Sequence, residues 1–471
     1  MLNNMEIKKI LLVNPAFGKI YEKTSIKGVA PSTPPLSLAC LAGSLIEKNH
    51  EVKIFDFNLY KNSNQKFIEC IKDFCPDFVG ITFVTPLVNT AGRISRLVKK
   101  INKEIIVIGG GAHCSSFPES ALKEAFLDIV IIGEGDFSIQ DIVSGKSLEK
   151  IKGIAYRKKG KILINKKRDF IKNLDILPFP AHHLYEINKY HVSSAIARKN
   201  PVAWLETSRG CVYGCIYCNK SCFGRTFRAK SPERVVKEFI QIKKLGLKEV
   251  HLTDDGFTTD IERAKKICNL LIKNKVNILW STITGIRVDR VDKELLEKMK
   301  EAGCYRVYFG IESGSQKILN RIKKGITLEQ VRNAVKWAKE AGLEVAGYFM
   351  IGLPDETEET MQQTIDFAKS LNLDLAKISI TIPLPATELF NELDKEKQIK
   401  TYDWEMFKFY TLPSTIYNHK NLSWKTINKY YNKFYRKVYL NPRFILNRLK
   451  SSVRNKTLFE DIKTALSINW I

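Results

Sequence analysis

Three cysteines lie close together near the middle of the chain, in the segment Cys211-Val-Tyr-Gly-Cys215-Ile-Tyr-Cys218. On one tight loop, three thiolates can bind three irons of a cubane cluster and leave the fourth iron open, whereas a fourth cysteine would saturate the cluster. The open iron can chelate a ligand that offers an amine and a carboxylate, as an amino acid does. The spacing therefore predicts a 4Fe-4S cluster held by Cys211, Cys215 and Cys218.

A zinc site with Cys222 as the fourth ligand is the competing interpretation. Zinc ligands usually come as two separated cysteine pairs, or as one pair with histidines, which the gaps of three and two residues match poorly. The chain has ten cysteines in 471 residues, and they are too dispersed for a disulfide scaffold. For most of the others, burial as a small apolar side chain is the simplest prediction. These others are Cys40, Cys70, Cys75, Cys114, Cys222, Cys268 and Cys304.

From Trp204 onward, short apolar runs alternate with helical segments. Six such units suit an open or partial (β/α)6 barrel of the TIM type, whose chemistry lies at the carboxyl ends of the strands. The expected strands are Trp204–Ser208, Glu249–Thr253, Ile278–Thr284, Tyr305–Ile311, Val345–Met350 and Leu375–Ile380. The cysteine segment follows the first of these strands, as a site in such a barrel should.

The first 150 residues show the same alternation, which is typical of a doubly wound, Rossmann-like parallel sheet. The expected strands are Ile10–Val13, Val52–Phe55, Phe78–Phe83, Ile105–Ile108 and Ile129–Ile132. The expected helices are Leu36–Lys48, Gln65–Phe74, Thr90–Ile101 and Pro118–Ala125. Several strands end in glycine-rich turns, and ligands of such sheets lie across these carboxyl ends. We therefore expect a second ligand in this domain.

A chain of this length is too long for one core. We predict an α/β protein with a doubly wound domain over residues 1–150 and a linker over 151–195 that begins with a basic hairpin-like stretch. A barrel over 196–390 and a helical region over 391–471 follow. The helical region is expected to break at Asn441-Pro442, because proline cannot continue a helix.

The chain from about Trp204 to Ile382 resembles the radical S-adenosylmethionine (SAM) superfamily. The resemblance rests on the cysteine triplet, the segment 253–257 after the second strand, 310–314 after the fourth and 347–354 at the fifth. It implies SAM contacts by Tyr217, Asp254, Asp255, Arg287, Glu312, Ser313 and Gly352. Asp254-Asp255 stands where the superfamily more often has Gly-Gly-Glu. The alternative is structural: the aspartates would cap a turn, and Glu312 would pair with an arginine such as Arg306.

The order of the domains resembles the cobalamin-binding branch of that superfamily. The resemblance implies a cobalamin site formed by Asn14, Pro35, Thr85, Gly109, Gly110, His113, Gly133, Glu134 and Gly135. The chain contains no Asp-x-His-x-x-Gly, so we do not expect histidine to ligate the cobalt. His113 is then either a corrin contact or a hydrogen-bonded loop histidine. A dinucleotide-binding domain is the alternative, but no Gly-x-Gly-x-x-Gly follows the first strand.

These cofactors imply an enzyme that cleaves SAM reductively to a 5′-deoxyadenosyl radical and methylates an unactivated carbon of a small-molecule or lipid-like substrate. An oxidative cyclase or rearrangement enzyme would have the same domain order, and the sequence does not separate the two. An RNA methylthiotransferase is a weaker alternative, because such enzymes add cluster cysteines to the first domain and a β-barrel at the end. A third alternative is a protein without catalytic activity, in which an iron–sulfur cluster or zinc ion supports binding to a partner. No catalytic residue is assigned.

The formal charge of +26 favours anionic partners. We expect a reductase of the flavodoxin or ferredoxin type as electron donor, and we do not expect nucleic acid. Residues 425–450 interleave aromatic and basic side chains, which either pack a helical cap onto the barrel or contact anionic lipid. With no signal peptide and no apolar run of about 18 residues, we expect a cytoplasmic protein, with contact at the membrane surface if the lipid interpretation holds.

Overall fold

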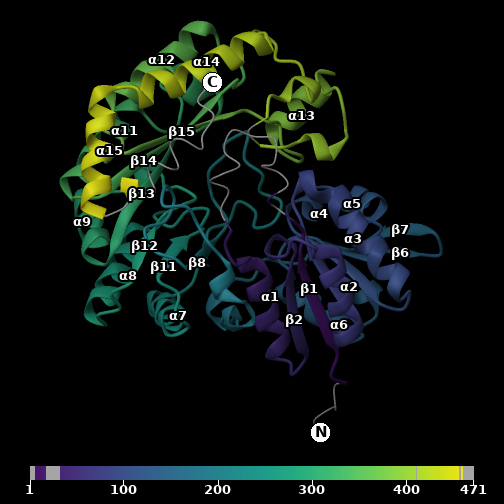
Figure 1. Ribbon diagram of the computed structural model, residues 1–471. Coiled ribbons are helices and arrows are strands. Elements are labelled where there is room, and N and C mark those ends of the chain that lie inside the picture. The colour runs from purple at the N-terminus through teal and green to yellow at the C-terminus, as the bar shows by residue number, and fades with distance from the viewer. Residues whose placement is uncertain (1–5, 17, 19–31, 410, 456–457, 460–471) are drawn as a thin grey trace.

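The computed structural model describes residues 6–16, 18, 32–409, 411–455 and 458–459. Two α/β units lie side by side, and the last helices of the chain curve over the outside of the second unit (Figure 1). Both units are built on parallel sheets, so the predicted fold class is confirmed.

The first unit is a seven-stranded sheet in the order β2-β1-β3-β4-β5-β6-β7. Its strands are β1 Lys9–Asn14, β2 Glu51–Asp56, β3 Phe78–Thr82, β4 Ile106–Gly110, β5 Ile129–Ile131, β6 Ile154–Lys158 and β7 Lys161–Ile164. Its helices are α1 Leu36–Ile46, α2 Ser63–Phe74, α3 Val88–Ile101, α4 Ala112–Ser116, α5 Pro118–Glu124 and α6 Asp136–Val143. The hairpin β6–β7 adds two antiparallel strands to the edge beside β5, so the hairpin expected in the linker is structurally part of the first sheet.

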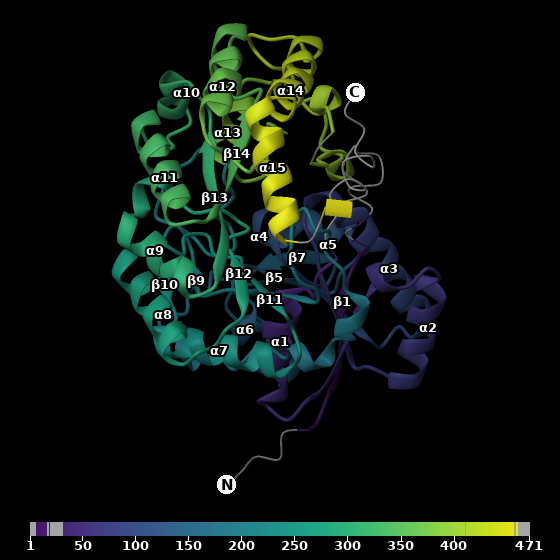
Figure 2. The ribbon, with the colours of Figure 1, turned by 60° about the vertical axis from the view of Figure 1, so that its left-hand side comes forward.

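The second unit is a six-stranded parallel sheet in the order β15-β14-β13-β12-β11-β8. Its strands are β8 Val202–Leu205, β11 Glu249–Leu252, β12 Leu279–Ser281, β13 Cys304–Glu312, β14 Glu344–Ile351 and β15 Leu375–Ile380. The helices α7 Pro232–Lys244, α8 Ile261–Lys273, α9 Lys293–Glu301, α10 Gln316–Arg321, α11 Leu328–Glu340 and α12 Glu358–Ser370 accompany them. The view in Figure 2 shows these helices on the outer face of the curved sheet, as in a partial barrel.

The first barrel strand differs from its prediction. The strand β8 ends at Leu205, and the next extended residues, Ser208–Arg209 (β9), pair instead with Arg228–Ala229 (β10) in a separate antiparallel ladder. The ladder brings together the two ends of the segment that carries the cysteines. The cysteine segment is therefore a closed loop rather than a simple strand-to-helix turn.

After the barrel, the described residues form the helices α13 Glu388–Lys395, α14 Trp424–Tyr439 and α15 Pro442–Asn455, with the predicted break between the last two. The end of the predicted helical region, at 456–457 and 460–471, lies outside the described residues. The aromatic side chains of α14 face the barrel. The hydroxyls of Tyr435 and Tyr439 donate to the carbonyls of Ile378 and Ala376 at 3.1 and 2.7 Å. These tyrosines cover the outward carbonyls of the edge strand β15, which would otherwise be open to pairing. The packing interpretation of these aromatics is thus confirmed, and no helix in the described ranges could cross a membrane.

Candidate active site

The cysteine loop is held at its base by glycine and by the β9–β10 ladder. Gly210 has φ +80°, and a Cβ there would lie 2.3 Å from the carbonyl oxygen of Thr226, so only glycine fits. The thiol of Cys211 is buried, whereas Cys215 and Cys218 are half-buried. The Cys218 amide donates to the Cys215 carbonyl at 3.2 Å, which makes a tight turn between these two cysteines.

The zinc interpretation requires several ligands around one ion. Within the described ranges, no three His, Cys, Asp or Glu side chains converge as ligands of one metal ion must. A cubane spreads its ligands over several irons, so its cysteines need not converge on one point. Cys222, the fourth ligand of the zinc interpretation, instead lies 3.5 Å from the Ser115 hydroxyl. Cys222 therefore has a partner in the first unit.

The two aspartates after β11 have different surroundings. Asp254 is buried and accepts hydrogen bonds from the Thr207 amide at 2.6 Å and the Ser208 hydroxyl at 2.7 Å. Burial raises its carboxyl pKa, and these bonds oppose the rise. Asp254 therefore holds the start of the cysteine loop. Asp255 is exposed, and its charge contributes to the raised pKa of the Cys218 thiol. Of the two aspartates, Asp255 is therefore the one near the cysteines.

Glu312 ends β13 in a strained conformation. Its φ is +67°, at an irregularity in the β13–β14 pairing, and such strain in a residue other than glycine is often found at functional sites. Its carboxylate accepts from the ammonium of Lys324 at 2.7 Å and from the Tyr217 hydroxyl. The alternative pairing with Arg306 is wrong, because Arg306 binds Glu344 at 2.8 Å. Through its bond with Tyr217, Glu312 connects the end of β13 to the cysteine loop.

Arg287 and Ser313 also have partners within the protein. The guanidinium of Arg287 stacks 3.5 Å from the ring centre of Tyr213, in the cysteine loop, and pairs with Asp289 at 2.8 Å. The Ser313 hydroxyl lies 3.1 Å from that of Thr364 and accepts from an amide in its own turn. Arg287 is therefore next to the loop, whereas Ser313 is a buried support for the end of β13.

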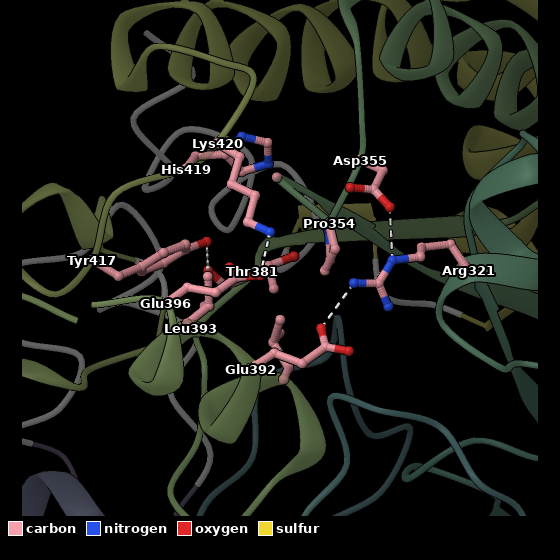
Figure 3. Close-up of a pocket in the computed structure, with 12 residues that line it drawn as sticks. Arg321, Pro354, Asp355, Thr381, Glu392, Leu393, Glu396, Tyr417, His419 and Lys420 are labelled. Carbon is pink, nitrogen blue, oxygen red and sulfur yellow. Dashed lines mark hydrogen bonds and ion pairs between the residues drawn. The ribbon is translucent and has the colours of Figure 1, made fainter. Parts of the chain in front are cut away.

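Gly352 follows β14 and lines a small cavity of about 30 Å³, enough for about one water molecule. Figure 3 shows Arg321 at this cavity between Asp355 and Glu392. The guanidinium nitrogens of Arg321 lie 2.7 and 2.8 Å from the carboxylate oxygens of these two residues. The Gly352 amide donates to the buried carboxyl of Glu356 at 2.7 Å. Burial raises the pKa of Glu356 to about 8. Sequence reasoning missed Glu356, because its burial depends on the tertiary structure.

A pH dependence follows from Glu356. Its pKa is raised from 4.5 to about 8, so the folded state binds a proton that the unfolded state has lost. The free energy of unfolding should therefore fall as pH rises from about 4.5 to 8. Glu356→Gln should remove this contribution, so the variant should gain stability relative to wild type across that range. Urea unfolding of both proteins at several pH values measures the difference. A pH-independent difference would contradict the assignment.

A cavity of about 640 Å³ lies at the carboxyl ends of the first sheet, within the size range of ligand pockets. Seven of the nine predicted cobalamin residues line it: Asn14, Pro35, Gly109, Gly110, Gly133, Glu134 and Gly135. A Cβ on Gly110 would meet no atom within 4 Å, so the backbone here borders open space. The barrel contributes Trp204, Glu206 and Thr253 to the same lining.

The two other predicted residues, Thr85 and His113, are not brought to this lining. His113 is fully buried among Phe83, Phe117 and Trp404, and its Nδ1 lies 3.4 Å from the Thr85 hydroxyl. Burial lowers the pKa of His113 to about 4, so the ring is neutral at physiological pH. His113 therefore belongs to an aromatic core that includes Trp404, a residue distant in the sequence, and not to the lining of the cavity.

A buried ion network joins the two units at the floor of the cavity. Arg209 lies between Glu134 and Asp136 at 3.0 and 2.8 Å, and Arg228 reaches Glu134 at 2.7 Å. All four side chains are at most 6% exposed. Because Arg209 directly precedes the cysteine loop, the network fixes the loop against the glycine turn after β5. Sequence reasoning missed Arg209, whose position beside the loop was its only signal.

Removal of Arg209 should be costly. Arg209→Ala leaves buried Asp136 without its arginine and leaves Glu134 with Arg228 alone, and breaking a buried pair costs about 3–5 kcal/mol. We expect this loss in the free energy of unfolding measured with urea. The control is Arg332→Ala, which removes an exposed arginine bonded to Ser370 and should cost less than about 1 kcal/mol. Equal losses in both variants would contradict a structural role for the network.

Comparisons with known proteins agree with this geometry. Residues 205–368 match the radical SAM superfamily model, and residues 25–143 match the B12 binding domain model. An uncharacterized methyltransferase, PH0819, from Pyrococcus horikoshii is 36% identical over 94% of this chain and 95% of its own length. Cytidylyl-2-hydroxyethylphosphonate methyltransferase from Streptomyces wedmorensis is 31% identical over 82% and 81%. The solved structure of OxsB, a cobalamin-dependent SAM radical enzyme, matches with a TM-score of 0.75 at 19% identity and covers 97% of this chain and 72% of that one.

The chain belongs to the cobalamin-binding radical SAM enzymes. It is an enzyme whose cofactors are a 4Fe-4S cluster, SAM and cobalamin. The residues present fit these groups: three cysteines lie on a closed loop, and Cys222 and Phe223 at the far end of that loop line the cavity with the glycine backbone wall. An electron donor and a small-molecule substrate complete the requirements of such an enzyme.

Proposed function

We propose that this protein is a methyltransferase that acts on an unactivated carbon of a small-molecule or lipid-like substrate. The observation that carries the proposal is the shared cavity, which is lined by the strand ends of the first sheet and by Trp204, Glu206 and Thr253 of the barrel. A corrin bound there would lie next to these barrel residues, at the carboxyl ends of the strands, where active sites of such folds lie. When bound, the cofactors supply a methyl carrier and a route for one electron into SAM.

The residues of the chain have the tasks of binding, orientation and exclusion of water. We propose that Cys211, Cys215 and Cys218 bind the cluster, and that Tyr217, Asp255, Arg287, Glu312 and Gly352 surround SAM. In the same proposal Asp254 and Ser313 act through the backbone they hold, and the seven cavity-lining residues contact the corrin. Backbone glycine at position 110 supports this assignment, because it leaves room for a flat ring close to the strand end.

The inner wall of the barrel supports a small-molecule substrate. Tyr308 and Tyr348 stack with ring centres 5.3 Å apart, and the ammonium of Lys377 lies 6.0 Å from the Tyr348 ring. Ala376 and Ile378, its neighbours in β15, belong to the buried core, so alternation along the strand turns Lys377 toward the inside of the barrel. We propose that the charge of Lys377 favours a substrate with an anionic group.

Product analysis separates methyl transfer from cyclisation. A methyltransferase that draws its methyl group from SAM must release S-adenosylhomocysteine as well as 5′-deoxyadenosine, whereas a cyclase releases only the latter. We would reduce the reconstituted protein with hydroxocobalamin and SAM and follow both products by chromatography. Release of both supports the proposal. Deoxyadenosine without S-adenosylhomocysteine would favour the cyclase and count against methyl transfer.

We further propose a flavodoxin or ferredoxin type of reductase as the electron donor and a peripheral contact with anionic membrane. Support for the contact comes from α15, where Leu446, Leu449 and Val453 are 57, 45 and 64% exposed. Positions 446, 449 and 453 lie along one side of a helix, and the segment also carries basic residues. This combination is typical of helices that lie on anionic lipid. We therefore assign the proposed membrane contact to α15, because the aromatic side chains of α14 pack against the barrel.

Flotation with vesicles rich in phosphatidylglycerol tests the contact. Wild type should float with the vesicles, and the combined change of Leu446, Leu449 and Val453 to Gln should reduce the floating fraction at least about fivefold, because burial of each side chain is worth about 1.5 kcal/mol or more. The matched control changes Ile7, Leu163 and Ile176 to Gln, three exposed apolar residues of the first unit and its linker. Equal flotation of all three proteins would contradict the proposal.

A further inference from the structure

The far end of the cysteine loop rests on helix α4 of the first unit. The Asn219 side-chain amide donates to the Ser116 hydroxyl at 2.8 Å, and the hydroxyls of Ser116 and Ser221 are 3.1 Å apart. The thiol of Cys222 donates to the Ser115 hydroxyl at 3.5 Å. Asn219 directly follows the proposed cluster ligand Cys218. The loop is therefore bonded to the first unit within one residue of a cluster ligand.

Ser115 and Ser116 also hold the glycine turns that line the large cavity of the first sheet. The Ser115 hydroxyl donates to the Gly111 carbonyl at 2.9 Å and accepts from the Gly133 amide at 3.0 Å. With the bond from Cys222, its one proton and both of its lone pairs are used. Ser116 also reaches the Ala112 carbonyl at 2.8 Å. Gly111, Ala112 and Gly133 all line the cavity.

We infer that these contacts, which we call the serine seam (Ser115, Ser116, Asn219, Ser221 and Cys222), couple cobalamin binding to cluster loading. A bound cluster fixes the loop through three thiolates, and the loop then fixes α4 and the turns after β4 and β5. In the cluster-loaded protein, the turns after β4 and β5 are therefore already ordered when the corrin binds. By linkage, cobalamin strengthens cluster binding by the same factor.

The size of the effect follows from the number of contacts. Two to three hydrogen bonds of ordinary strength separate the coupled from the uncoupled state, and site-to-site couplings are typically about 5- to 150-fold. We expect hydroxocobalamin to bind about tenfold more tightly to the cluster-loaded protein than to the cluster-free protein. This inference rests on the two cofactor sites and does not depend on methyl transfer.

The test is a visible-absorbance titration of hydroxocobalamin into the full chain, with and without the reconstituted cluster. Wild type should give the tenfold ratio of dissociation constants, whereas Asn219→Ala and Ser116→Ala should each lower it, and Ser116→Ala should lower it further because it removes two of the three seam contacts. The matched control is Asn274→Ala, which removes an exposed side-chain bond to Leu270 at the end of α8 and should keep the wild-type ratio. Because the readout is corrin affinity, no substrate is needed.

Two further measurements keep the test decisive. The double variant Asn219→Ala/Ser116→Ala should lose no more coupling than Ser116→Ala alone, because Ser116→Ala already removes the bond from Asn219 together with the contact to Ser221. Hydrogen exchange over residues 111–117 should slow when the cluster is loaded in wild type and stay unchanged in Asn219→Ala. Equal corrin affinity in wild type with and without the cluster would overturn the inference. So would a tenfold ratio that persists in both single variants.

Discussion

Cys215→Ala is expected to abolish formation of 5′-deoxyadenosine, a loss of at least about 1000-fold, because the cluster supplies the only route for an electron into SAM. Cys215 lies at the turn that joins it to Cys218, with both thiols half-buried on the closed loop. Two remaining cysteines cannot hold a cubane that needs three protein ligands. The measurement is chromatography of the products after anaerobic reduction with SAM, together with iron analysis and the cluster's visible absorption.

The matched control is Cys75→Ala, which removes an exposed thiol at the end of α2. This variant should keep its iron content and its rate of SAM cleavage. The cavity residues are untouched in Cys215→Ala, so hydroxocobalamin should still bind, with the reduction in affinity that the serine seam imposes on cluster-free protein. A Cys215→Ala protein with a full cluster and normal cleavage would contradict the assignment of this loop.

Gly110→Phe is expected to weaken hydroxocobalamin binding about 100-fold while leaving the fold intact. Gly110 ends β4, and a Cβ there meets nothing within 4 Å, so the phenyl ring would project into the cavity rather than into the protein. Forcing a side chain into space that a ligand needs costs about 1–3 kcal/mol or more, which corresponds to this loss of affinity. A visible-absorbance titration measures it, and a thermal melt shows whether the fold is kept.

Gly110→Ala is the graded control, because one methyl group occupies little of the cavity. Its affinity should fall by less than about fivefold, and SAM cleavage should persist in both variants because the cluster loop is unchanged. Unaltered corrin affinity in Gly110→Phe, in a protein that melts like wild type, would place the corrin elsewhere.

The fold and the cluster loop were predictable from the sequence because their signals are local. Periodic apolar runs define strands such as Ile10–Val13, which the structure confirms within β1. The cysteine spacing is fixed within eight residues, and the glycine turns lie next to the strands that they follow. The helix break at Asn441-Pro442 is equally local, because it depends on the missing amide of one proline.

Only the tertiary structure decided which polar side chains face the cavities and which support the protein. Asp254 hydrogen-bonds Thr207, 47 residues earlier, and Trp404 encloses His113. Glu312 pairs with Lys324 rather than Arg306, and Arg209 finds its carboxylates in the other unit. The sequence determined the two sheets and the cysteine loop, since strand periodicity and close spacing are properties of neighbouring residues. The partners of a buried charge depend on which distant segments fold beside it, and that choice belongs to the tertiary structure.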